Sequence, residues 1–163
     1  MKNRSNKGFS LAEVLLAVAL LILMTAAATV GISSAVNSEN KVVDEANAQL
    51  LMSTCMIELR NEMTGAAEIQ VEDGVITYRS DRTGNYSSLR STDSGIIVSD
   101  YINNGSGGIQ RRLVSRSAST TPLEVTYSSV SLDADGLIIF KKLCVKRGDA
   151  VIAENPEFKI RTA

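Results

Sequence analysis

Residues 7–13 read KGFSLAE, and residues 14–24 continue as VLLAVALLILM. The apolar run extends from Val14 to Val36, which is 23 residues without a charged side chain. A transmembrane helix needs about 20 mainly apolar residues, so this segment is long enough to cross a bilayer. Three basic residues precede it, and this asymmetry predicts that the N-terminus stays in the cytoplasm while the rest is exported. We therefore expect a single-pass membrane anchor near the N-terminus.

Glu13 is the unusual residue of this segment. A charged side chain costs about 2.5–3.5 kcal/mol at the centre of a membrane helix, and less near the interface. No basic residue lies within one helical turn after Glu13. If the chain were cut after Gly8, however, Phe9 would carry a new α-ammonium group four residues before Glu13. That amine could neutralise the carboxylate within the chain or from a neighbouring subunit, so Glu13 is a candidate functional residue.

Residues 8–13, GFSLAE, resemble the class III signal of type IV prepilins and of the pseudopilins of type II secretion and competence systems. In that family a membrane prepilin peptidase cuts after the glycine and N-methylates the phenylalanine, and the glutamate pairs with the amine of an adjacent subunit. The resemblance therefore implies cleavage between Gly8 and Phe9, N-methylation of Phe9, and a role in assembly for Glu13. One departure is Val30, which stands about where many members have a proline, so a proline kink is not expected.

Beyond residue 36 the pattern is that of an amphipathic helix. Apolar residues recur at steps of three and four, which places them on one helical face: Ala48, Met52, Cys55, Leu59 and Met63. Thr64-Gly65 is a suitable stop signal. The prediction is one helix from Phe9 to Met63, about 80 Å long at about 1.5 Å per residue. Its apolar face should pack against whatever follows.

The remaining sequence predicts β-strands. Runs of β-branched and aromatic residues between turn residues are expected to be strands: 75–78, 95–99, 123–127 and 137–140, with weaker candidates at 151–153 and 158–160. Two segments rich in Ser, Thr, Gly, Asn and Asp, residues 81–94 and 103–108, are expected to be loops. The expected fold class is α+β, with a long N-terminal transmembrane and amphipathic helix packed on an antiparallel sheet, which is also the pilin plan.

The expected organisation has four parts. They are a leader peptide at residues 1–8, a transmembrane and filament-core half of the helix at 9–36, its amphipathic half at 37–64, and an extracytoplasmic β-sheet domain at 65–163. The resemblance implies three kinds of partner: the prepilin peptidase, other pilin subunits and the membrane assembly machinery. The chain is expected in the cytoplasmic membrane before assembly, and in a cell-surface or periplasm-spanning filament afterwards.

The function that these features predict is that of a structural, non-enzymatic subunit, a minor pilin, of a type IV pilus-like filament. One alternative is a pseudopilin of a type II secretion or competence DNA-uptake system, and another is a membrane-anchored secreted binding protein. An ordinary secretory signal peptide cleaved near Ala26–Ala28 would explain the basic leader and the apolar run. It would leave Glu13 unexplained.

Composition argues against several kinds of active site. The chain has no histidine, which removes the commonest general base, and its two cysteines fit no metal spacing. We expect no catalytic residue, no metal and no cofactor. Asp133-Ala134-Asp135-Gly136 is not an EF-hand loop, because position twelve is Cys144; a single calcium ion in this loop stays an open alternative. Residues 37–163 carry 14 basic and 17 acidic side chains, so nucleic acid is an expected partner only for a competence pseudopilin.

Cys55 and Cys144 allow two interpretations. Cys55 lies on the apolar face of the predicted helix and Cys144 follows a predicted strand, so the two could meet where the sheet packs on the helix. A disulfide closing so long a loop could contribute about 4–5 kcal/mol, and an extracytoplasmic location permits it. The other interpretation is two buried free thiols, which are common core residues.

Overall fold

The computed structural model describes residues 10–101, 108–115 and 122–162. The chain divides into two compact units, with the boundary between Val43 and Asp44. A single helix, α1 (Leu11–Thr64), supplies the first unit and contributes its C-terminal part to the second. The predicted start at Phe9 lies outside the described residues, and the predicted end at Met63 is confirmed to within one residue.

The first unit is helical throughout its described residues. Ser10 precedes the helix, and its side-chain oxygen accepts a hydrogen bond from the backbone N–H of Glu13 at 3.3 Å. A serine in this position caps the helix because it satisfies one of the free N–H groups of the first turn. The helix continues without interruption through Val30 and Gly31, in keeping with the absence of a proline there.

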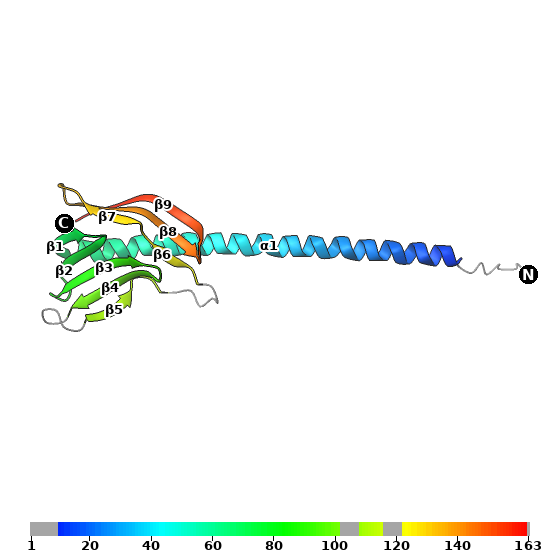
Figure 1. Cartoon of the computed structure of the whole chain (residues 1–163), viewed down its shortest axis with the longest axis horizontal. Helices are drawn as coiled ribbons and strands as arrows, with labels where there is room; N and C mark the ends of the chain where they lie inside the picture. Colours follow the sequence, from blue (N-terminus) through cyan, green and yellow to red (C-terminus); the bar gives the residue numbers. More distant parts are fainter. Residues whose placement is uncertain (1–9, 102–107, 116–121, 163) are drawn as a thin grey trace, which may run out of the picture. The chain divides into compact units, whose positions relative to one another are not determined.

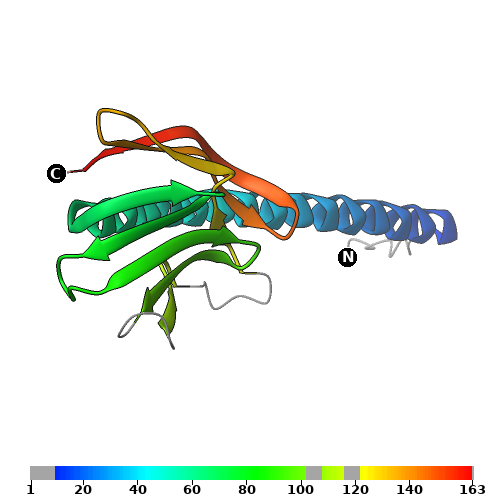
Figure 2. The same cartoon turned by 60° about the vertical axis from the view of Figure 1, so that its left-hand side comes forward.

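The second unit contains two antiparallel sheets around the C-terminal part of α1 (Figures 1 and 2). The first sheet is a five-stranded meander of β1 (Ala66–Glu72), β2 (Val75–Ser80), β3 (Tyr86–Thr92), β4 (Gly95–Tyr101) and β5 (Gly108–Arg112). The second consists of β6 (Glu124–Thr126), β7 (Ser129–Leu132), β8 (Leu137–Arg147) and β9 (Ala150–Arg161). In the second sheet β6 and β7 pair with successive parts of β8, and β9 pairs along the other edge of β8.

The α+β class is confirmed, and the expected single sheet is two sheets. Five side chains of α1 are buried at the intervals that the sequence predicted: Ala48, Met52, Cys55, Leu59 and Met63. They form one hydrophobic core with inward-facing residues of both sheets, including Tyr78, Leu89, Ile138 and Phe140. The Tyr127 hydroxyl donates a hydrogen bond of 2.9 Å to the Gly74 carbonyl and so ties β6 to the β1–β2 turn. The second unit therefore has a complete core of its own.

The expected loop at residues 81–94 was wrong, because it contains strand β3. This strand is polar, yet its Ser87 is completely buried. Ser87 Oγ donates a hydrogen bond of 2.7 Å to Asp100 Oδ1 on β4, and Ser88 Oγ lies 3.1 Å from the Tyr101 hydroxyl. Buried hydroxyls are tolerated where they find such partners. The other expected loop, 103–108, lies mostly outside the described residues, and Gly108 begins β5.

Candidate functional site: the N-terminal helix

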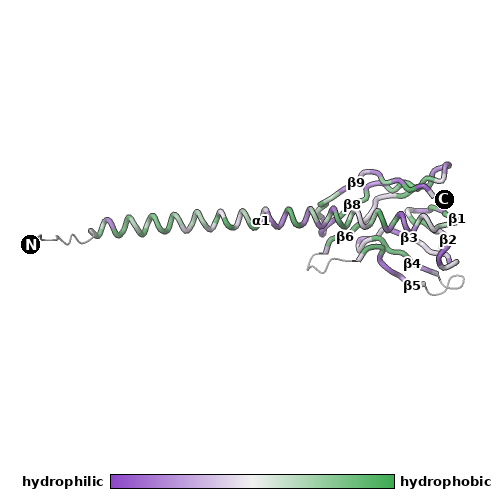
Figure 3. Tube along the Cα trace, turned by 180° about the vertical axis from the view of Figure 1, so that it is seen from behind, coloured by the Kyte–Doolittle hydropathy of each residue, from purple (hydrophilic) through white to green (hydrophobic). Residues whose placement is uncertain are grey.

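The first unit presents a continuous apolar surface. Its side chains from Leu11 to Val36 are exposed, including Leu15, Leu21 and Ile22, each at about 60%. Figure 3 shows the concentration of hydrophobic residues in this part of α1. By length and composition α1 is able to cross a membrane, and none of its most apolar stretch is buried by the described residues. Because this surface does not serve the fold of the described chain, it is available to lipid or to another subunit.

The two threonine hydroxyls of this segment bond to the helix itself. Thr25 Oγ1 donates to the Leu21 carbonyl at 3.0 Å, and Thr29 Oγ1 donates to the Thr25 carbonyl at 2.8 Å. Such bonds to a carbonyl four residues earlier are a usual arrangement for hydroxyl side chains in a helix. They matter here because an unsatisfied polar group is costly in hydrocarbon. The segment therefore remains compatible with a bilayer despite its threonines.

Glu13 lies in the first turn of α1 and is exposed. It is the third helical residue, where a negative charge is favoured by the free N–H groups and the dipole of the helix start. This local effect lowers the free energy of a carboxylate at this position, although it does not supply a counter-charge. Gly8 and Phe9, the predicted cleavage and methylation residues, lie outside the described residues.

Residues 3–29 match the family described as the prokaryotic N-terminal methylation motif. The match thus places this motif over the start of the apolar helix α1. This motif is the signal of type IV pilins and pseudopilins, which confirms the resemblance drawn from residues 8–13. A search of the curated proteins found no match, and neither did a search of the solved structures.

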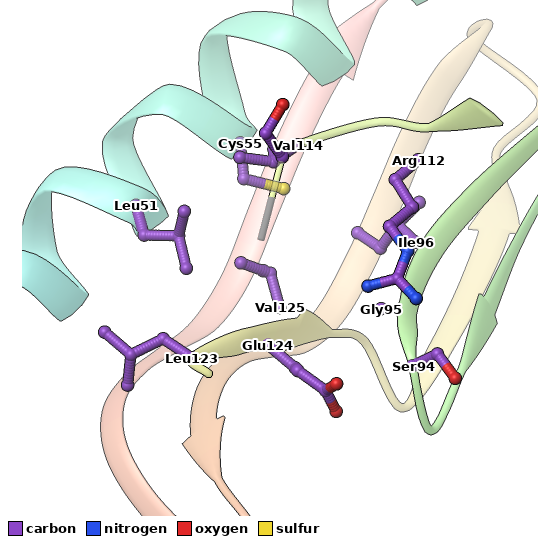
Figure 4. Close-up of a pocket in the computed structure, with 11 residues that line it drawn as sticks. Leu51, Cys55, Ser94, Gly95, Ile96, Arg112, Val114, Leu123, Glu124 and Val125 are labelled. Atoms are coloured by element: carbon purple, nitrogen blue, oxygen red, sulfur yellow. The ribbon is translucent and has the colours of Figure 1, made fainter. Parts of the chain in front are cut away.

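Cys55 and Cys144 are both buried and both free thiols in the structure. Cys55 projects from α1 into a small, mainly apolar hollow that it shares with Leu51, Ile96 and Val125 (Figure 4). Burial, with a smaller contribution from nearby Glu58, raises the pKa of Cys55 to about 12. Since the thiolate is the reactive form, Cys55 is chemically inert at neutral pH.

Cys144 projects from the other face of β8. Its neighbours Leu143 and Val145 are completely buried, and side chains alternate between the two faces along a strand. Cys144 Sγ lies 3.3 Å from Thr126 Oγ1 on β6, whereas the preceding residue of β6, Val125, lines the hollow of Cys55. The intervening sheet therefore separates the two sulfurs.

Two arginines of the sheets form ion pairs with acidic residues of α1. Arg111 Nη2 donates to Glu62 Oε2 at 2.7 Å, and Arg147 forms a paired contact with Asp44, at 2.7 Å between Nη2 and Oδ1. Lys141 and Lys142 are exposed on β8. Among the described residues, no group of three or more Cys, Asp or Glu side chains is placed to hold a metal ion.

Sequence reasoning missed the Asp44–Arg147 pair, whose partners lie 103 residues apart. It also missed the bond between Tyr78 and Glu62, of 2.7 Å. No local sequence pattern reveals these pairs, because each joins a residue of α1 to a residue of a β-strand that lies further along the chain.

Proposed function

We propose that this chain is a structural subunit of a type IV pilus-like filament, held in the membrane by its N-terminal helix before assembly. The observation that carries the proposal is the methylation motif at residues 3–29 joined to an apolar helical surface that the described chain leaves exposed. The second unit has its own core, so the apolar segment is not needed to complete it. A segment of this kind suits a subunit that exchanges lipid for neighbouring helices.

In this proposal the prepilin peptidase cleaves between Gly8 and Phe9 and methylates the Phe9 amine. The new ammonium group and the Glu13 carboxylate have opposite charges and lie at the same end of the apolar segment. In a low-dielectric setting an unpaired charge is costly, whereas a matched pair is strongly directional. Pairing of Glu13 with the ammonium of an adjacent subunit would therefore recruit that subunit and set its register.

The test replaces Glu13 by Ala or by Gln. Both variants should still insert into the membrane, because a polar cost is removed, and both should still be cleaved after Gly8. The amount of subunit recovered in sheared filaments, or captured with partner pilins from membranes, should fall in both. Gln keeps the shape of the side chain and loses only its charge, so its loss of assembly identifies the charge as the cause.

Glu39→Gln is the matched control, because Glu39 is an exposed glutamate of the same helix outside the apolar run. It should assemble like the wild type. Wild-type assembly of both Glu13 variants would show that the carboxylate serves only the helix start, and the pairing mechanism would then be wrong.

A further inference from the structure

Two strands at opposite borders of the second unit are paired along one edge. Among the described strands, β5 pairs only with β4, and β9 pairs only with β8. Figures 1 and 2 show β5 and β9 on opposite sides of α1. The edge strands β1, β6 and β7 instead contact strands of the opposite sheet. An unpaired edge presents N–H and C=O groups and is a template for pairing with another strand.

The register of β5 shows which of its backbone groups face outward. The N–H of Leu113 donates to the Ile96 carbonyl at 2.9 Å, so Leu113 bonds to β4. Backbone groups of successive residues point alternately to the two sides of a strand. The N–H and C=O groups of Gly108, Gln110 and Arg112 therefore face the free edge. Within these described residues no bulge or proline interrupts the pairing with β4, so neither of these devices protects the edge.

The same alternation applies to the C-terminal half of β9. The N–H of Thr162 donates to the Gly136 carbonyl at 3.2 Å, which continues the pairing between β9 and β8. Two residues earlier, Ile160 also bonds toward β8, whereas the backbone groups of Lys159 and Arg161 face the free edge. Lys159 and Arg161 are thus placed to bond an added strand.

Strand β9 runs in the same direction as α1. At the end of β8, Arg147 contacts Asp44, and further along β9 the Asn155 amide lies 3.5 Å from Met56 Sδ. Later residues of β9 are therefore beside later residues of α1. This order fixes the direction of β9 within the second unit.

Strand β5 runs in the opposite direction. Arg111 bonds to Glu62 near the end of α1, whereas Val114, just after β5, shares a hollow with Cys55, which is earlier in α1. Copies that assemble from the same membrane present α1 in the same direction. The β5 edge of one copy and the β9 edge of the next would therefore meet as antiparallel strands, which pair well.

One apolar side chain of β5 would gain a partner in this pairing. Ile109 lies on the face of the first sheet that packs on α1, because its cross-strand partners lead to the buried Tyr78. It is nevertheless 63% exposed. Ile160 of β9 belongs to the core-facing side of the second sheet. If Gln110 lies opposite Lys159, Ile109 lies directly opposite Ile160, and such apolar pairs stabilise a sheet.

Charge favours the same register. It places Arg112 opposite Glu157, and opposite charges on facing strands are stabilising. A shift of two residues in one direction would place Arg112 opposite Lys159, and like charges in this arrangement are destabilising. A shift in the other direction would place Gln110 opposite Glu157, whose N–H already donates to Asn155 Oδ1 at 3.2 Å. A shift of one residue would turn every side chain to the wrong face.

We infer that β5 of one copy pairs antiparallel with β9 of the next copy in the assembled filament, with Gln110 opposite Lys159. This inference rests on the proposed function and extends it to the surface through which the folded domains meet. Because the two edges differ, each copy keeps one edge for a further copy, and a contact of this type builds an open filament. Two β5 edges could pair antiparallel only if their helices ran in opposite directions.

The first test is disulfide trapping of the full chain in cells that assemble it. Gln110 and Lys159 are exposed, and facing residues of an antiparallel pair have Cα atoms about 5.5 Å apart, which suits a disulfide. A chain with both Gln110→Cys and Lys159→Cys should form a series of covalent multimers under mild oxidation. Each single variant should form none, and neither should the parent chain, whose thiols are buried. Copies with different tags, one carrying each variant, should give a mixed dimer.

Arg90→Cys combined with Lys159→Cys is the matched control. Arg90 is exposed on the same sheet face as Gln110, but it lies on β3, and β4 separates it from the free edge. This pair should form no multimers. Equal cross-linking of the control, or none of the test pair within recovered filaments, would overturn the inference. The proposed function would then still stand on a wild type that assembles and a Glu13→Ala variant that does not, whereas a wild type that never assembles would overturn both.

The second test compares Gln110→Pro with Gln110→Ala. Proline removes an N–H that faces the free edge and leaves the bonds to β4 in place. It should lower filament recovery about fivefold or more, which corresponds to the loss of one hydrogen bond. Alanine keeps the N–H and should assemble like the wild type. Equal recovery of the two variants would overturn the pairing, and the disulfide test decides the matter if proline also lowers the stability of the folded chain.

Discussion

The hydroxyl of Tyr78 donates a hydrogen bond of 2.7 Å to Glu62 Oε1, and this bond joins the end of α1 to strand β2 of the first sheet. Tyr78 is completely buried. The other oxygen of Glu62 accepts from Arg111 on β5. Burial, together with the bond to Glu62, holds the pKa of Tyr78 well above its ordinary value. The phenol therefore stays protonated, and remains a donor, at neutral pH.

Tyr78→Phe should lower the free energy of unfolding of the full chain in detergent. A hydrogen bond to a charged group contributes about 1.5–3 kcal/mol, and its loss leaves part of Glu62 unsatisfied. Tyr86→Phe is the matched control, since Tyr86 also bonds to a glutamate, Glu68, but is 45% exposed. The control should lower the free energy of unfolding by distinctly less, because its bond is exposed to water. Denaturant unfolding measures both, and equal losses would show that burial does not strengthen the Tyr78 bond.

Asp44→Asn should remove a pH-dependent part of the stability. The hydrogen bonds and charge of Arg147 lower the pKa of Asp44 below its ordinary 3.8. A carboxylate with a lowered folded-state pKa stabilises the fold above the unfolded pKa, and this contribution is lost as the pH falls through the folded pKa. The difference in melting temperature between wild type and Asp44→Asn should therefore be constant above about pH 5 and shrink below about pH 4.

Asp135→Asn controls for the loss of one negative charge, because Asp135 is an exposed residue of the β7–β8 turn. It should not reproduce this profile. A difference between wild type and Asp44→Asn that persists unchanged to pH 2 would show that the pair does not form in solution.

The two cysteines should react as free thiols. Maleimide added to the denatured, unreduced protein should label both Cys55 and Cys144, and reduction should leave the intact mass unchanged. In the folded protein Cys55 should react far more slowly than a cysteine placed at the exposed Ser53, because burial removes its thiolate. A chain that accepts no label until it is reduced would establish the disulfide instead.

The mature chain should begin at a methylated Phe9. The motif at residues 3–29 predicts a cut between Gly8 and Phe9, and N-terminal peptides from purified filaments or membranes would show it by mass spectrometry. Co-expression without a prepilin peptidase should leave the leader attached. A start at Thr29 would establish an ordinary secretory signal peptide and would remove the apolar segment from the mature protein.

Local patterns were sufficient to predict the helix. The absence of charge from Val14 to Val36 and the three-and-four spacing from Ala48 to Met63 are properties of neighbouring residues, and both describe α1 correctly. Strand β2 and the longer β8 were predicted for the same reason, because their own residues are β-branched and aromatic.

The missed strands depend on partners elsewhere in the chain. Strand β3 contains three serines, and its buried Ser87 is tolerated only because Asp100 of the next strand accepts its hydrogen bond. Strand β5 is largely exposed and pairs with β4 alone, so no apolar alternation marks it. The division into two sheets likewise follows from pairing and not from any strand's own composition. The separation of Cys55 from Cys144 depends on which face of β8 each residue occupies, which spacing along the chain does not reveal.

The exposed apolar surface of the first unit has a consequence for how a subunit could leave the membrane. Thirteen large apolar side chains between Leu11 and Val36 are uncovered, and transferring each to water would cost about 1.5–3 kcal/mol. The total, roughly 20–40 kcal/mol, exceeds the whole stability of an ordinary domain. In the proposed role, a subunit therefore cannot be drawn out into solution and then captured. The apolar side chains must pass directly from contacts with lipid to contacts with protein. The growing end of the filament must therefore lie in the bilayer next to the subunit that it adds.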